Sequence, residues 1–195
     1  MRVFKFGGSS VANADNIKKV AAIVAAAQEG KKIIVVSAMS GVTNQLLHIG
    51  NTASNADENY KSLLQSLLNH HLNEAKRLVP VTTQSACLSG IMQLFNEIEE
   101  IADSVCHLKE FSPATKDRIL SFGEILSSKI ISAHFQSIGL KHSWLDSSEL
   151  ILTNSKFGAA EVKFAETNKL IKEKLNDSQE DIFLVPGFIA KNKKN

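Results

Sequence analysis

Two short hydrophobic segments on either side of one helical segment constrain the fold of this chain more than any other feature. Residues 2–6 and residues 32–37 (Lys-Ile-Ile-Val-Val-Ser) both have the composition of buried strands. Between them, apolar residues recur at helical spacing over residues 14–29, and Gly30 provides a stop. A strand–helix–strand unit requires a parallel pair with a right-handed crossover. The chain is therefore predicted to be an α/β protein.

Both strands end in turns that are rich in glycine and hydroxyl residues. The first turn begins at Gly7, and the second occupies residues 37–44 (Ser-Ala-Met-Ser-Gly-Val-Thr-Asn). Ligands of open α/β sheets bind beyond the carboxyl ends of the strands. We therefore expect the two turns to border a single site.

Lys5 is the residue that points most directly to a ligand. A lysine within a buried strand is costly unless it is paired or bound to an anion, and the alternative is an edge strand from which the amine reaches water. Gly7 and Gly8 allow close approach of the backbone, and Ser9 and Ser10 supply hydroxyls ahead of a helix N-terminus. This pattern favours phosphate binding. It is not a P-loop, because there the lysine follows the glycines.

The second turn and one later glutamate are further candidates for ligand binding. Ser37 and Thr43 are suited both to capping a helix and to holding a polar ligand, and their closeness to the first turn favours the ligand. Glu124 belongs to a predicted helix over residues 113–137, next to Gly123. Its stripe on that helix consists of Asp117, Ser121, Glu124 and Ser128. The stripe is either a surface that binds an amine or a solvent-facing side.

The remaining elements and the composition describe an ordinary globular protein. Further helices are predicted over 57–78, 83–107 and 160–175, and extended segments over 141–146, 151–153 and 181–188. The 195 residues are 44% hydrophobic and 22% charged, with a net charge of +2, which gives no reason to expect a nucleic-acid or membrane partner. No signal peptide or membrane-spanning run is present, so the cytoplasm is expected.

Cysteine and histidine usage gives no indication of a metal site. Cys87 and Cys106 both fall in helical patterns, as expected for unpaired cysteines in a reducing compartment. His70 and His71 are expected on an exposed helix surface, without further residues at metal-ligand spacing. His134 is expected to be structural.

Four segments, taken in order, resemble the successive motifs of the aspartokinase N-terminal region, within the amino acid kinase superfamily. They are residues 5–11 (Lys-Phe-Gly-Gly-Ser-Ser-Val), 37–44, 121–124 (Ser-Phe-Gly-Glu) and 186–189 (Pro-Gly-Phe-Ile). The resemblance covers the whole chain, and residues 1–16 are especially similar to the start of bifunctional aspartokinase–homoserine dehydrogenases. Ser9 stands where threonine is usual in the family, and it keeps the hydroxyl.

The resemblance implies a three-layer αβα sandwich with a mainly parallel sheet, the amino acid kinase-like fold in truncated form. It also implies transfer of the γ-phosphoryl group of ATP, with Mg²⁺, to the side-chain carboxylate of L-aspartate, giving 4-phospho-L-aspartate. That reaction opens the biosynthesis of lysine, threonine and methionine. Lys5 is the implied catalytic residue. The implied phosphate-binding residues are Lys5, Gly7, Gly8 and Ser9, and the implied aspartate-binding residues are Ser37, Thr43, Glu124 and Phe188.

One departure from the family pattern limits what is expected of this chain. The family motif Arg-Gly-Gly-Ser-Asp, expected after residues 186–189, does not occur before Asn195. Residues 1–195 are therefore expected to be the N-terminal, aspartate-binding lobe of a longer enzyme, inactive when alone. The nucleotide lobe and the regulatory domains would be absent, and NAD(P) would be relevant only if a dehydrogenase were fused downstream. The longer enzyme is expected to be a homo-oligomer.

Two alternatives to an aspartokinase lobe remain open. Another amino acid kinase would share the fold, but the Ser-Phe-Gly-Glu segment at residues 121–124 argues against it. A non-catalytic binding or assembly fragment would use an exposed sheet edge for association.

Overall fold

The computed structural model describes residues 1–27 and 29–192. Its strands are β1 (Arg2–Phe6), β2 (Lys32–Val36), β3 (Ser143–Trp144), β4 (Leu152–Thr153), β5 (Ile182–Pro186) and β6 (Lys191–Asn192). Its helices are α1 (Ala14–Ala26), α2 (Val42–Ser54), α3 (Tyr60–Leu78), α4 (Gln84–Leu108), α5 (Pro113–Ser137), α6 (Ser147–Leu150) and α7 (Phe164–Asn176), and a 3-10 turn spans Val81–Thr83.

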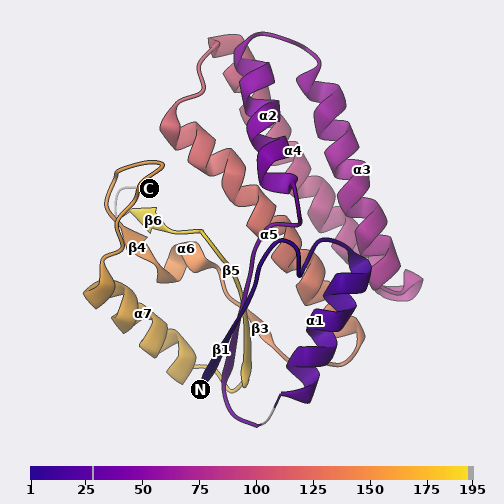
Figure 1. Cartoon of the computed structure of the whole chain (residues 1–195), viewed down its shortest axis with the longest axis vertical. Coiled ribbons are helices and arrows are strands. Elements are labelled where there is room, and N and C mark those ends of the chain that lie inside the picture. Colours follow the sequence, from indigo (N-terminus) through magenta and orange to yellow (C-terminus); the bar gives the residue numbers. More distant parts are fainter. Residues whose placement is uncertain (28, 193–195) are drawn as a thin grey trace.

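The central sheet has four parallel strands in the order β1-β2-β5-β3. β1 and β2 pair in parallel across α1, which confirms the predicted strand–helix–strand unit. Helices α1 to α5 lie on one side of the sheet, and α6 and α7 lie on the other (Figure 1). The predicted α/β architecture, with a parallel sheet between two helical layers, is therefore confirmed.

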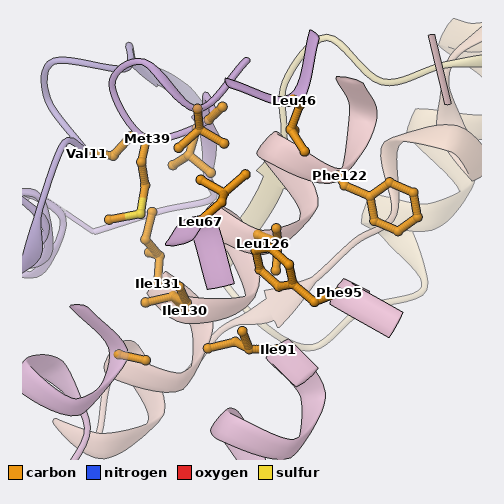
Figure 2. Close-up of a cluster of buried hydrophobic side chains, with 14 of the residues drawn as sticks. Val11, Met39, Leu46, Leu67, Ile91, Phe95, Phe122, Leu126, Ile130 and Ile131 are labelled. Atoms are coloured by element: carbon orange, nitrogen blue, oxygen red, sulfur yellow. The ribbon is translucent and has the colours of Figure 1, made fainter. Parts of the chain in front are cut away.

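The main core lies between the sheet and helices α1 to α5. Alternation along β2 sends Ile34 and Val36 into this core and leaves Ile33 for the smaller cluster beneath α7. Figure 2 shows side chains from several helices, including Leu67, Phe95 and Leu126, gathered in this shared interior. Burial of each such large apolar side chain contributes roughly 1.5–3 kcal/mol. The core therefore fixes α5 against the strands and against the α2–α4 bundle.

β1 is an edge strand, so the prediction of a buried first strand was wrong. Phe4 and Phe6 pack against the main core, whereas Val3 is 62% exposed and Lys5 is also exposed. The reason is the small size of the second helical layer, since α6 and α7 pack beneath β5 and its neighbours and leave this face of β1 open. Lys5 therefore reaches water without a desolvation cost.

Several predicted boundaries are close to the observed ones, and α5 matches its predicted range fully. Ser112 caps this helix by accepting a hydrogen bond from the backbone N–H of Thr115, and Pro113 occupies its first turn. α1 begins at Ala14 as predicted, but it ends at Ala26, three residues before the predicted end. α6 and β6 were not predicted, since such short elements carry no periodic signal.

The prediction that His71 lies on an exposed surface was wrong. His71 is fully buried in α3 and its ring packs edge-to-face on Phe95. Its Nδ1 lies 2.8 Å from the carbonyl oxygen of Leu67. α3 packs against both α2 and α4. More of its surface is therefore buried than the pattern of polar and apolar residues in its sequence predicts.

Candidate functional site

The motifs predicted to border one site meet at the carboxyl ends of β1, β2 and β5. The turn after β2 lies at the centre, where the backbone N–H of Ser37 donates to the carbonyl oxygen of Phe6 at 3.1 Å. On its other side, the backbone N–H of Gly187 donates to the carbonyl oxygen of Val36 at 2.7 Å. The carboxyl ends of three strands that are distant in sequence are thereby held side by side.

Glycines make this close convergence possible. A Cβ atom at Gly8 would lie 3.1 Å from the carbonyl oxygen of Ala38, and one at Gly123 would lie 2.9 Å from the Cβ of Ala38. A Cβ atom at Gly187 would lie 3.2 Å from the carbonyl oxygen of Val36. The first turn, α5 and the turn after β5 therefore all approach residues 36–38 at distances that side chains would oppose.

Glu124 is the buried carboxylate of this region. Only 7% of the residue is exposed, and burial raises the pKa of its carboxyl group. Hydrogen bonds from backbone groups of Ala38 and of Glu124 itself lower the pKa in part. A carboxylate held this way, beside glycine and alanine, is suited to receive a cationic group from a ligand.

The rest of the predicted stripe on α5 does not accompany Glu124 as a binding surface. The Asp117 carboxylate accepts a hydrogen bond from the backbone N–H of Gly158 at 2.7 Å, and the Ser121 hydroxyl donates to the carbonyl oxygen of Arg118. Ser128 is fully buried and accepts a hydrogen bond from the indole N–H of Trp144 at 3.0 Å. The solvent-facing alternative was wrong for this stripe, because Glu124 and Ser128 are buried. Binding of an amine remains a prediction, for Glu124 above all.

The first turn presents Lys5 and open backbone. Lys5 is exposed and makes no ion pair within the described residues. No atom lies within 4 Å of the position that a Cβ of Gly7 would take, so space remains above this glycine. Gly8, by contrast, packs on the turn after β2, and Ser9 is exposed.

The N-terminus of α1 does not take part in this site as predicted. The backbone N–H of Ala14 donates to a carboxylate oxygen of Glu74, from α3, at 2.5 Å. The Asn13 side chain accepts a hydrogen bond from the backbone N–H of Asn16 at 3.0 Å. Two of the first backbone donors of this helix are therefore engaged within the protein, and a phosphate would meet a carboxylate there.

The hydroxyls of the second turn are not used as helix caps. Gly41 precedes α2 in a left-handed conformation, with φ of 80°, and no side chain caps this helix. Ser37 is half-buried and Thr43 is exposed. The structure therefore does not show helix capping by Ser37 or Thr43, and ligand binding remains the prediction for both residues.

Phe188 follows Gly187 in a conformation that is rare for a large side chain. Its φ is 54° and 93% of the residue is exposed. Left-handed backbone at a bulky residue is strained, and such strain is most often found at ligand sites. The ring lies beside the site without lining an enclosed pocket.

Sequence reasoning missed the contribution of the segment after β3. The Ser147 side chain is fully buried and donates to the carbonyl oxygen of Pro186, at the end of β5. Nearby, the Nζ atom of Lys129 lies 3.2 Å from the centre of the Trp144 ring. These contacts join α5, β3 and β5, and no local pattern predicts them because the partners are far apart in sequence.

Two cavities within the described residues lie away from these motifs. One, of about 140 Å³, has an almost wholly apolar lining between β2, β5, α6 and α7. The other, of about 430 Å³, lies between the end of α4 and the start of α5. Across the described part of the chain, no three His, Cys, Asp or Glu side chains are grouped as a metal site requires. No helix in residues 1–27 or 29–192 combines the length and hydrophobicity needed to cross a bilayer.

Comparison with known proteins places this geometry in a family. The model of the amino acid kinase family matches residues 1–195. Aspartokinase 1, chloroplastic, of Arabidopsis thaliana is 33% identical over 98% of this chain. Bifunctional aspartokinase/homoserine dehydrogenase 1, chloroplastic, of the same plant is 27% identical over 99% of the chain. The chain spans 34% of the first relative's length and 21% of the second's.

Solved structures agree with the sequence comparison. E. coli aspartokinase III in complex with aspartate and ADP, in the R-state, superposes with a TM-score of 0.89. The same enzyme with lysine and aspartate, in the T-state, gives 0.86. Both are 26% identical to this chain and cover all of it, whereas it covers 42% of theirs. The family match over the whole chain, the shared fold and the convergence of the four motifs lead to one conclusion: the chain belongs to the amino acid kinase family, and it resembles the aspartokinases within it.

Proposed function

We propose that residues 1–195 form the aspartate-binding lobe of an aspartate kinase. Such an enzyme transfers the γ-phosphoryl group of ATP to the side-chain carboxylate of L-aspartate. The observation that carries this proposal is the buried Glu124 carboxylate beside Ala38, at the meeting point of the four motifs. The structures solved with aspartate, and with aspartate and ADP, support it by their similarity.

The proposed roles divide the site into two ends. At the substrate end, Glu124 pairs with the ammonium group of aspartate, and the free hydroxyls of Ser37 and Thr43 donate to its carboxylates. The exposed ring of Phe188 covers the bound amino acid at the edge of the site. Because the substrate carboxylate is itself the nucleophile, the reaction needs no general base, and positioning with charge neutralisation is sufficient.

At the phosphate end, Lys5 neutralises charge on the transferred group. Gly7, Gly8 and Ser9 offer backbone and hydroxyl donors, and the open space above Gly7 leaves room for a phosphate. The described residues provide no cluster of three metal-ligating side chains here, and kinases commonly hold Mg²⁺ through the nucleotide phosphates.

Other properties of the whole enzyme are proposed with it. The chain spans 42% of the length of E. coli aspartokinase III, so we propose that residues 1–195 supply aspartate binding and that turnover needs a nucleotide lobe in addition. We further propose a cytoplasmic homo-oligomer that serves lysine, threonine and methionine biosynthesis. NAD(P) would matter only in a form fused to a homoserine dehydrogenase. A non-catalytic binding or assembly fragment is the alternative.

A calorimetric titration tests the substrate end. The chain should bind L-aspartate and prefer it over succinate, which lacks the ammonium group. Glu124→Gln should weaken aspartate binding by roughly tenfold to a hundredfold and abolish the preference, because a charge-assisted contact is lost. Glu173→Gln, at an exposed position on α7, is the control and should bind as the parent does. Equal affinity of the parent chain for aspartate and succinate would contradict the proposal.

A turnover assay tests the phosphate end. In the chain joined to the remainder of an aspartokinase catalytic domain, Lys5→Ala should abolish formation of the acyl phosphate trapped with hydroxylamine. Aspartate affinity should change by less than about twofold, because Lys5 acts on the phosphoryl group. Near-normal turnover in Lys5→Ala would remove Lys5 from the mechanism.

A further inference from the structure

We propose that Glu74 is a positioning residue for the phosphate loop, which we define as residues 7–13. This inference rests on the function proposed above, because it concerns the loop assigned there to phosphate. Glu74 lies on α3, outside all four motifs and 60 residues from its contact at Ala14. It acts through α1 and does not contact the ligand.

Val11 anchors the phosphate loop in the main core, but few hydrogen bonds hold the loop from within. Inside it, the backbone N–H groups of Ser10 and Val11 both point to the carbonyl oxygen of Gly7, at 2.9 and 3.3 Å. A further hydrogen bond to the middle of the loop comes from α1, where the Asn16 side-chain amide donates to the carbonyl oxygen of Ser9 at 2.8 Å. The position of Ser9 therefore depends on the position of the first turn of α1.

Glu74 fixes that first turn. Its carboxylate is largely buried and accepts the backbone N–H of Ala14 at 2.5 Å. Arg77 approaches both carboxylate oxygens of Glu74 at 3.1 Å, and it also pairs with Asp15 at 2.7 Å. A negative charge at a helix N-terminus is favourable, and the arginine offsets the desolvation of the carboxylate. α3 and α1 are thereby fastened at the point where the phosphate loop joins the helix.

The same contact directs where phosphate binds. Free N–H groups at a helix N-terminus attract phosphate, but the Glu74 carboxylate takes the N–H of Ala14 and adds a negative charge there. A phosphate group is therefore repelled from the start of α1 and favoured at the other end of the loop. That end carries Lys5 and the open space at Gly7.

Hydrogen–deuterium exchange on the intact chain tests the positioning role directly. Glu74→Ala should speed amide exchange in residues 8–16 by about tenfold, as expected for loss of a charge-assisted hydrogen bond, with little change elsewhere. Glu74→Gln, which keeps an acceptor oxygen, should give a smaller rise at the same amides and serves as the readout if the alanine variant does not fold. Glu58→Gln, at an exposed glutamate paired with Lys61, is the matched control and should change nothing in the loop.

Ligand binding separates positioning from a general loss of structure. In the chain joined to the remainder of an aspartokinase catalytic domain, ADP affinity should fall by about tenfold in Glu74→Ala and less in Glu74→Gln, while L-aspartate affinity stays within about twofold. Unchanged loop exchange in both variants, or a rise spread evenly over the chain, would overturn the inference. If loop exchange responds but the parent chain does not bind L-aspartate, the proposed function fails while the coupling of Glu74 to the loop stands.

Discussion

At the scale of single residues, the strained backbone at Phe188 is informative because packing of its side chain does not offset the steric cost. Its ring is almost fully exposed, so packing does not repay the left-handed conformation. Lys109 has the same φ of 54° but sits at the C-terminus of α4, where such a conformation commonly ends a helix. Phe188 and Lys109 therefore have the same backbone strain, but only Phe188 lies in one of the four motifs.

Phe188→Gly should raise the free energy of unfolding by about 1 kcal/mol, because glycine adopts positive φ without the steric cost. It should also weaken L-aspartate binding, since the ring proposed to cover the substrate is removed. Urea denaturation and calorimetry measure the two effects. Lys109→Gly is the control, with a similar gain in stability and unchanged binding. Unchanged aspartate affinity in Phe188→Gly would mean that the ring has no role at the site.

At the scale of elements, α5 is both the most predictable helix and the one that carries the site. Ser112 and Pro113 mark its start and Gly139 follows its end, so its bounds were predicted correctly from local signals. Its contacts were not predictable in the same way. Glu124 meets Ala38 and Ser128 meets Trp144, and neither pairing has a local signature in the sequence.

A pair of glycine substitutions separates helix propensity from packing. Gly90 in α4 has open space around its missing Cβ, so Gly90→Ala should stabilise the chain by about 1 kcal/mol through propensity alone. Gly123 in α5 faces the Cβ of Ala38, so Gly123→Ala gains the same propensity but forces the turn after β2 outward.

Thermal or urea denaturation should therefore show opposite signs for these two variants, with Gly123→Ala destabilised by about 1 kcal/mol or more. Gly123→Ala should also weaken aspartate binding, because Glu124 and Ala38 are displaced from each other. A stabilised Gly123→Ala variant with normal binding would show that the turn yields easily and that the close approach is unimportant.

At the scale of the whole molecule, buried histidines tie stability to pH. Burial lowers the pKa of His71 to about 4 and lowers that of His134 as well. As pH falls below about 6.5, the unfolded chain takes up protons that the folded chain refuses, so the free energy of unfolding decreases. For His71 the loss continues down to about pH 4 and amounts to about 3 kcal/mol. Glu124 has the opposite effect on stability at low pH, because its raised pKa lets the folded state hold a proton more readily than the unfolded chain does.

Urea denaturation from pH 7.5 to pH 4.5 measures this effect. The parent chain should lose stability steadily over this range, and His71→Leu should lose less because its neutral side chain does not titrate. His107 is the matched control, since its Nδ1 also faces a carbonyl oxygen four residues earlier but its side chain is exposed. His107→Leu should keep the parent's pH dependence. An unchanged pH dependence in His71→Leu would contradict the assignment of His71 as a buried neutral residue.

The sequence by itself determined the parallel strand–helix–strand start, the position of α5 and the candidate ligand residues. These depend on local composition, spacing and glycine placement, which a linear pattern carries. Only the tertiary structure decided that β1 is an edge strand and that His71 is buried. It also decided that the Glu74 carboxylate, from α3, accepts the backbone N–H at the start of α1. Each of these depends on which distant segment covers a given face. Burial and partner choice are set by contacts between elements far apart in the chain, and no local pattern encodes them.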